Sequence, residues 1–190
     1  MQPETRIQAE FAALATLAAA TAGQAATLVT IAARYREAIR SGHTLFFAGN
    51  GGSAADAQHI AAEYVVRLRK TRPALAAVAL TVDSSVLTAV ANDLGFEQAF
   101  ARQVDALGRA GDVLVLHSTS GESANLLAAA RAARTRGMTV VAFLGRGGGR
   151  LLPLADLAFV VASDDTSRIQ EIQLAAEHAV AALVEEEGLA

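Results

Sequence analysis

Two pairs of polar side chains lie at helical spacing in otherwise apolar stretches. His59 and Glu63 are four residues apart in DAQHIAAEY, so a helix would place them on one face, one turn apart. Gln170 and His178 are two turns apart in the carboxy-terminal stretch that ends in LAAEHAVAALV. Any one of them could be an ordinary surface residue. Their apolar neighbours favour burial, however, and a buried His or Glu requires a partner.

A carboxylate and an imidazole together can move a proton at neutral pH. One takes a proton from the carbon beside a carbonyl while the other protonates the oxygen, which gives an enediol, the intermediate of aldose–ketose isomerisation. The set of His59, Glu63, Gln170 and His178 could equally coordinate a zinc ion that polarises the carbonyl. The residue types do not decide between metal-free and metal-assisted chemistry.

Two loops have the composition of phosphate-binding sites. Each follows an apolar run and precedes a helical pattern, so its backbone N–H groups and the helix amino terminus favour an anion. Alone, each could be an ordinary turn with an N-cap. Loops that follow the first and third strands of one parallel sheet would meet in the same crevice, which favours a shared site. The residues are Asn50, Gly51, Gly52 and Ser53 in the first loop, and Ser118, Thr119, Ser120 and Ser123 in the second.

The first loop also matches the dinucleotide fingerprint G-x-G-x-x-A, at Gly49, Gly51 and Ala54. The acidic residue that binds ribose would follow by roughly 20 residues, where the chain has Arg69 and Lys70 instead. There is also no room for a separate catalytic domain. We therefore expect no nucleotide cofactor.

Apolar runs alternate with helical patterns along most of the chain. From about Glu4 to Arg40 the spacing predicts two helices, interrupted at Gly23. Five short apolar runs follow, at 44–49, 76–81, 112–118, 139–145 and 157–162, each followed by a turn and a helix-like stretch. Because these runs are apolar throughout, both faces of each strand should be covered. This predicts an α/β fold: a doubly wound, flavodoxin-like, five-stranded parallel sheet in a single domain over 1–190, with leading helices in 1–42 and the core in 43–190.

The composition narrows the class of protein. Of the 190 residues, 53% are hydrophobic and 18% charged. The longest apolar runs are too short to span a bilayer, so we expect a soluble domain. Cysteine is absent and MQPETRIQAE does not resemble a signal peptide, which favours the cytoplasm. A net charge of -3, with only one short basic group at Arg67–Arg72, argues against nucleic acid and favours a small-molecule ligand.

Four segments together resemble the phosphoheptose isomerases, sugar-isomerase (SIS) proteins that convert sedoheptulose 7-phosphate into a heptose 7-phosphate. They are GNGGSAADAQHIAAE, the AND at 91–93, STSGESAN and RIQEIQLAAEH, and the resemblance runs from about Leu45 to the carboxy terminus. It implies a homotetramer with active sites at subunit interfaces, and a role for the leading helices in oligomerisation. The product could have the manno or the altro configuration.

The resemblance also implies roles for individual residues. Glu63 matches the catalytic base and His178 the catalytic acid, and the matching zinc ligands are His59, Glu63, Gln170 and His178. The implied substrate-binding positions are Asn50, Gly51, Gly52, Ser53, Arg67, Asn92, Asp93, Ser118, Thr119, Ser120, Ser123 and Gln170.

Three positions depart from the family pattern. Glu122 stands where the family commonly has asparagine, and would weaken phosphate binding if its charge pointed inward. Gln173 replaces a frequent histidine, and Ser167 an aspartate or proline.

The main rival function is a non-catalytic SIS protein, such as relatives that bind the replication-initiator protein or modules that sense a sugar phosphate. Those relatives lack the Glu and His pair that is present here.

Overall fold

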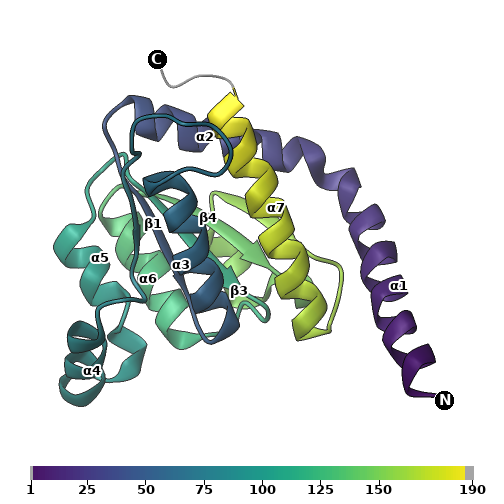
Figure 1. Cartoon of the computed structure of the whole chain (residues 1–190). Coiled ribbons are helices and arrows are strands. Elements are labelled where there is room, and N and C mark those ends of the chain that lie inside the picture. The colour runs from purple at the N-terminus through teal and green to yellow at the C-terminus, as the bar shows by residue number, and fades with distance from the viewer. Residues whose placement is uncertain (1, 187–190) are drawn as a thin grey trace.

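A five-stranded parallel sheet forms the centre of the fold (Figure 1). The computed structural model describes residues 2–186. The strand order is β2-β1-β3-β4-β5, the flavodoxin-like order, so the chain reverses its direction of travel across the sheet between β1 and β3. The strands are β1 (Leu45–Gly49), β2 (Ala77–Ala79), β3 (Val113–Ser118), β4 (Thr139–Leu144) and β5 (Leu157–Val160). All five predicted strands and their parallel pairing are confirmed.

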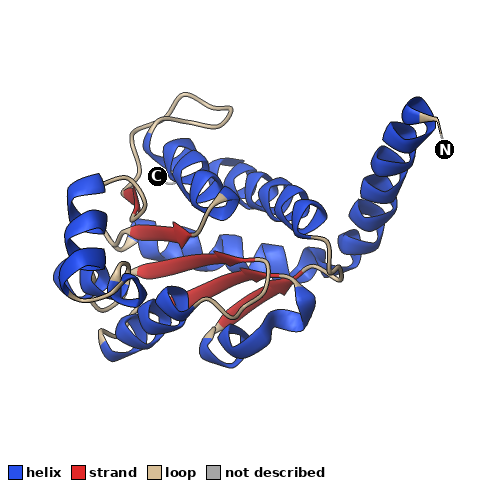
Figure 2. Cartoon of the chain, turned by 90° about the horizontal axis from the view of Figure 1, so that it is seen from below, coloured by secondary structure: helices blue, strands red, loops and turns tan. Residues whose placement is uncertain are grey.

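Helices cover both faces of the sheet (Figure 2). One core, around Phe47 and Tyr64, lies between the sheet and α2, α3 and α7, and a second, around Phe46 and Leu126, lies under α5 and α6. Neighbouring residues of β1 therefore point into different cores, which explains why the strands are apolar throughout. The helices are α1 (Pro3–Thr21), α2 (Ala25–Arg40), α3 (Gly52–Val65), α4 (Ser84–Asp93), α5 (Ala101–Leu107), α6 (Ala124–Thr135) and α7 (Thr166–Glu186), with 3-10 turns η1 (Ala22–Gln24), η2 (Phe96–Gln98) and η3 (Arg146–Leu154).

The two leading helices are confirmed, with η1 at the predicted break. α1 has no buried residue and extends away from the sheet (Figure 2). The expectation that no apolar segment is long enough to span a bilayer was wrong, because Pro3–Arg40 passes that test by length and composition. The prediction counted unbroken apolar runs, whereas here alanines are interspersed with small polar residues. This remains weak support for a membrane helix, since core helices of soluble proteins pass the same test.

α3 is shorter than its sequence pattern predicts. The amphipathic sequence AADAQHIAAEYVVRLR predicts a helix to Arg69, but the helix ends at Val65. The backbone N–H groups of Leu68, Arg69 and Lys70 donate to the Glu185 carboxylate, which lies in the last turn of α7, instead of to carbonyls one turn earlier. A contact between residues more than 110 positions apart thus ends the helix.

Candidate active site

α3 and α7 bring His59, Glu63 and His178 together, although the spacing predicted only that His59 and Glu63 share one face of a helix. The Nε2 atoms of His59 and His178 are 2.9 Å apart, and His59 Nε2 lies 3.4 Å from Glu63 Oε1. The two rings meet edge to face, with centroids 5.0 Å apart. At 2.9 Å one imidazole donates a proton and the other accepts it, so the cluster can hold and transfer protons.

The sequence predicted that His59 is buried, and in the single chain this prediction is wrong. Its side chain is 48% exposed, whereas that of Glu63 is 17% exposed. The residues that pack on the core from this part of α3 are Ile60 and Tyr64, so His59 and Glu63 lie at the edge of the helix. The cluster is therefore accessible to a ligand.

The first loop joins β1 to α3. Gly51 has a positive φ of 56°, a conformation that favours glycine, and it occupies the N-cap position of α3 without a capping side chain. A Cβ at Gly52 would collide with the Gln170 side-chain amide, so Gln170 packs directly against this loop. Gln170 lies eight residues before His178 on α7, which corresponds to about 12 Å at 1.5 Å per residue. The loop and the acid–base cluster thus lie at the two ends of the line of contact between α3 and α7, which we call the seam.

The second loop joins β3 to α6 and is rich in hydroxyl groups. Ser118 Oγ accepts a hydrogen bond from the Gly121 N–H at 2.9 Å, and Ser120 Oγ accepts one from the Glu122 N–H at 3.2 Å. Ser123 is the N-cap residue of α6, but its side chain makes no capping bond. Its hydroxyl therefore does not have the ordinary capping role that was the alternative to ligand binding.

The two loops border one cavity of about 620 Å³. The Asn50 and Asn125 side chains join the loops through reciprocal amide hydrogen bonds of 3.0 and 2.8 Å. Asn125 was quoted in the STSGESAN motif but was not predicted to have a role. The cavity is lined by Asn50, Gly51, Phe96, Glu97, Ser123, Ala124 and Asn125.

Glu122 pairs with Arg150 of η3 rather than standing alone beside the second loop. Its Oε2 lies 2.6 Å from Arg150 Nε, and its Oε1 accepts from the Arg150 backbone N–H at 2.9 Å. These hydrogen bonds to Arg150 hold the pKa of Glu122 below its usual value. The charge that the sequence placed near the phosphate loop is therefore compensated.

Three predicted binding residues lie away from the cluster. Asn92 and Asp93 are exposed at the end of α4, where the Asn92 Nδ2 donates to Asp93 Oδ1 at 2.7 Å. Arg67 is exposed in the segment that follows α3. No hydrogen bond or ion pair joins these three to the cluster among the residues described, so their roles in substrate binding stay predictions.

Three polar residues beneath the site were not predicted. His117, the last but one residue of β3, is stacked between Phe47 and Phe143 and meets Glu177 at 3.0 Å, with both polar side chains fully buried. Burial raises the pKa of the Asp56 carboxyl on α3, while His117 and His59 act in the opposite direction. Each residue adjoins a predicted functional segment, but apolar surroundings alone do not identify a buried polar pair.

The cluster fits a zinc ion. The donor atoms of His59, Glu63 and His178 all lie within 4.8 Å of one another. In a tetrahedral site with zinc–ligand bonds of 2.0–2.1 Å, ligand atoms are roughly 3.4 Å apart, and two imidazoles with one carboxylate are a known catalytic set. The Gln170 amide lies against Gly52, so its role as the fourth ligand stays a prediction.

Comparison with families of known proteins gives a consistent match. Residues 11–145 match the family model described as the SIS domain. A phosphoheptose isomerase of Roseiflexus sp. (strain RS-1) is 54% identical over 162 residues, which cover 85% of this chain and 82% of the relative. One of Burkholderia pseudomallei (strain K96243) is 53% identical over 160 residues, covering 84% and 81%.

Solved structures agree with the sequence relatives. A phosphoheptose isomerase from Neisseria gonorrhoeae has a TM-score of 0.92 at 40% identity, covering 97% of this chain and 99% of that one. One from Francisella tularensis has a TM-score of 0.95 at 32% identity, covering 98% and 100%. The similarity thus includes the leading helices as well as the sheet.

Proposed function

The chain belongs to the phosphoheptose isomerase family of SIS-domain enzymes, and from this membership we propose how its side chains divide the work of isomerising sedoheptulose 7-phosphate. The observation that carries the proposal is the cluster in which Glu63 and His178 both lie beside His59. A binding module would not require an acid and a base at the same point.

The second loop would hold the phosphate. Ser118, Thr119, Ser120 and Ser123 surround the amino terminus of α6, where free N–H groups and the helix dipole favour an anion. The first loop would contact the sugar, with Asn50 fixed by Asn125 and Gln170 packed on Gly52. Arg67, Asn92 and Asp93 would complete the binding site.

Proton transfer would take place at the other end of the α3–α7 seam. Glu63 would remove a proton from C1 of the open-chain ketose, and His178 would protonate the C2 oxygen to give the enediol. Return of a proton to C2 and loss of the hydroxyl proton from C1 give the aldose, a heptose 7-phosphate of manno configuration. The altro product differs at C3 and would require removal and return of a proton at that carbon as well. Atoms and charge balance without a co-reactant.

A zinc ion would be held by His59, Glu63 and His178, with Gln170 as fourth ligand if its side chain turns from Gly52 toward the cluster. When bound, it would supply Lewis-acid polarisation of the substrate carbonyl. His59, which faces both partners in the cluster, is the residue whose role depends most on the metal.

The assembly would be a cytoplasmic homotetramer with active sites at subunit interfaces. Its support here is the exposed apolar surface of α1, where Ile7 is 59% and Phe11 70% exposed. The half-exposed position of His59 and the remoteness of Asn92 and Asp93 would also be resolved if a second copy covered the site.

Incubating the protein with sedoheptulose 7-phosphate and reading the product by NMR tests the function and its stereochemistry together. We expect Ser120→Ala to weaken binding of sedoheptulose 7-phosphate by about tenfold, since hydrogen bonds to charged groups are worth about 1.5–3 kcal/mol. Binding of unphosphorylated sedoheptulose should change little. Equal losses for the two sugars would exclude the phosphate loop proposed here.

A further inference from the structure

One buried carboxylate holds the segment between α3 and β2. Glu185, in the last turn of α7, is 7% exposed. Its oxygens accept from the backbone N–H groups of Leu68 at 2.8 Å, Arg69 at 2.9 Å and Lys70 at 3.1 Å. Successive amides that point at one anion form a nest, so the path of this segment depends on Glu185.

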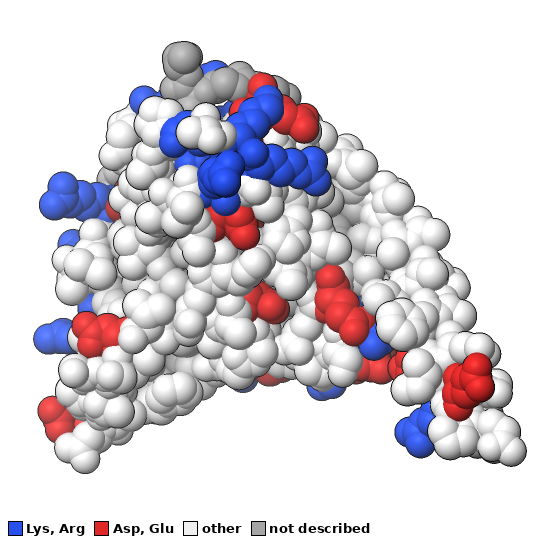
Figure 3. Space-filling view, in the orientation of Figure 1, with Lys and Arg blue, Asp and Glu red and all other residues white. Residues whose placement is uncertain are grey.

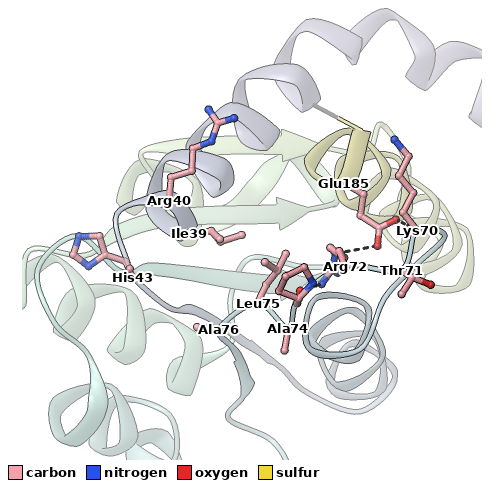
Figure 4. A pocket seen from close by; sticks show the side chains of 12 residues that line it. Ile39, Arg40, His43, Lys70, Thr71, Arg72, Ala74, Leu75, Ala76 and Glu185 are labelled. Atoms are coloured by element: carbon pink, nitrogen blue, oxygen red, sulfur yellow. Dashed lines mark hydrogen bonds and ion pairs between the residues drawn. The ribbon is translucent and has the colours of Figure 1, made fainter. Parts of the chain in front are cut away.

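Arg72 pairs with the same carboxylate (Figure 4) and also contacts the end of α3. Its Nε lies 3.2 Å from Glu185 Oε1, while its Nη1 donates to the Tyr64 carbonyl at 2.8 Å and its Nη2 to the Glu63 carbonyl at 2.6 Å. Nη1 also donates to the Pro73 carbonyl at 3.0 Å. The last carbonyls of a helix have no intrahelical donor, and a basic side chain can satisfy them. Arg72 thus links the backbone of Glu63 to α7.

Resting on the function proposed above, we propose that Arg72 and Glu185 are positioning residues that set the separation of Glu63 and His178. Glu63 lies on the helix whose end Arg72 holds, and His178 lies two turns before Glu185 on α7. A shift of α3 against α7 at this point moves the base relative to the acid. Misplacement of a catalytic group by about 1 Å can lower a rate by two orders of magnitude.

The surroundings keep this pair charged and in place. The side chains of Arg72 and Glu185 are only 11% and 3% exposed, so water screens their attraction weakly. Burial alone would raise the pKa of Glu185, but the three backbone N–H groups and Arg72 hold it below its usual value. Lys and Arg side chains gather on the surface near the end of α7 (Figure 3). The pair also forms one wall of a cavity of about 610 Å³.

The contact at the opposite end of the seam makes the proposal specific. There Gln170 packs on Gly52, beside the loops that would bind the phosphate and the sugar. Loss of the Arg72–Glu185 pair should therefore disturb proton transfer more than phosphate binding. A residue that only stabilises the fold would produce no such difference between kcat and KM.

The test compares Arg72→Gln with Arg72→Lys in the full-length protein, with Arg134→Gln as control because Arg134 forms an exposed ion pair with Asp156 away from the cluster. We expect Arg72→Gln to lower kcat for sedoheptulose 7-phosphate about tenfold or more, while KM stays within about threefold. Arg72→Lys should recover part of kcat, because its ammonium can still donate to Glu185. The control should match the unaltered protein.

The outcomes separate this inference from the function itself. An unchanged kcat in Arg72→Gln, measured well below its melting temperature, would overturn the positioning role even if Tm falls. If the unaltered protein does not isomerise the sugar, the function fails, and the inference is judged on the imidazole NMR signals. Those of His178 should shift in Arg72→Gln but not in Arg134→Gln, and unchanged signals would overturn it. Should Arg72→Gln not fold, Glu185→Gln, which keeps an oxygen acceptor for the amides, replaces it in both measurements.

Discussion

At the residue scale, the chemistry depends on spacing that is visible in the sequence and on distances that are not. Because His59 and Glu63 are four apart on a helix, their shared face could be predicted. The 2.9 Å contact of His59 with His178 depends on how α3 and α7 cross, which no local pattern specifies. The direction of Glu122 was equally hidden, since its partner Arg150 lies after the next strand.

The Glu122–Arg150 pair leads to a prediction about substrate affinity. Arg150→Gln would leave the Glu122 carboxylate uncompensated beside the phosphate loop, so KM for sedoheptulose 7-phosphate should rise about fivefold. The rise should shrink at high ionic strength, because both side chains are exposed. Steady-state kinetics at two salt concentrations measure it.

The double variant Glu122→Gln/Arg150→Gln provides the control, since it removes both charges. Its KM should return close to that of the unaltered protein. A KM that stays high would mean that Arg150 contacts the phosphate itself, contrary to the charge-compensation account.

At the element scale, the strands could be predicted because the sheet is covered on both faces, which leaves a continuous apolar pattern. The end of α3 could not be predicted, because the amides of residues 68–70 bond to Glu185 of α7. The buried contact of His117 with Glu177 was hidden for the same reason: it joins β3 to α7. Contacts between elements, rather than propensities within them, determined what sequence patterns missed.

The buried His117–Glu177 pair should matter for stability as a pair. Glu177→Leu would leave His117 without its acceptor in a fully buried position, and should lower the free energy of unfolding by roughly 3 kcal/mol. His117→Leu/Glu177→Leu replaces both polar groups by apolar ones and should lie within about 1 kcal/mol of the unaltered protein. Urea denaturation at one protein concentration measures both. Equal losses in the single and double variants would contradict this account, because removal of His117 would then not relieve the loss.

At the scale of the whole molecule, α1 is the feature that a single chain does not explain. It carries no buried residue, yet Ile7 and Phe11 are large, apolar and more than half exposed. A second copy of the chain that packs against this helix would bury them, as the proposed homotetramer requires. The sequence pattern predicted the helix but not the surface that covers it.

Phe11→Asp tests that interpretation of α1. A charge at the centre of a buried apolar contact should shift the protein to a smaller assembly in size-exclusion chromatography with light scattering. Gln8→Ala, also exposed on α1, should leave the assembly unchanged. If Phe11→Asp keeps the native mass, α1 does not hold the subunits together.

The central claim is that Glu63 and His178 transfer protons in an isomerisation through an enediol. The reaction of sedoheptulose 7-phosphate in D₂O, followed by NMR, tests it most directly. We predict a heptose 7-phosphate with deuterium at C2, and a rate at least about a hundredfold lower in Glu63→Gln and in His178→Gln, both still folded. Product without any deuterium at C2, or full turnover in either variant, would contradict the account.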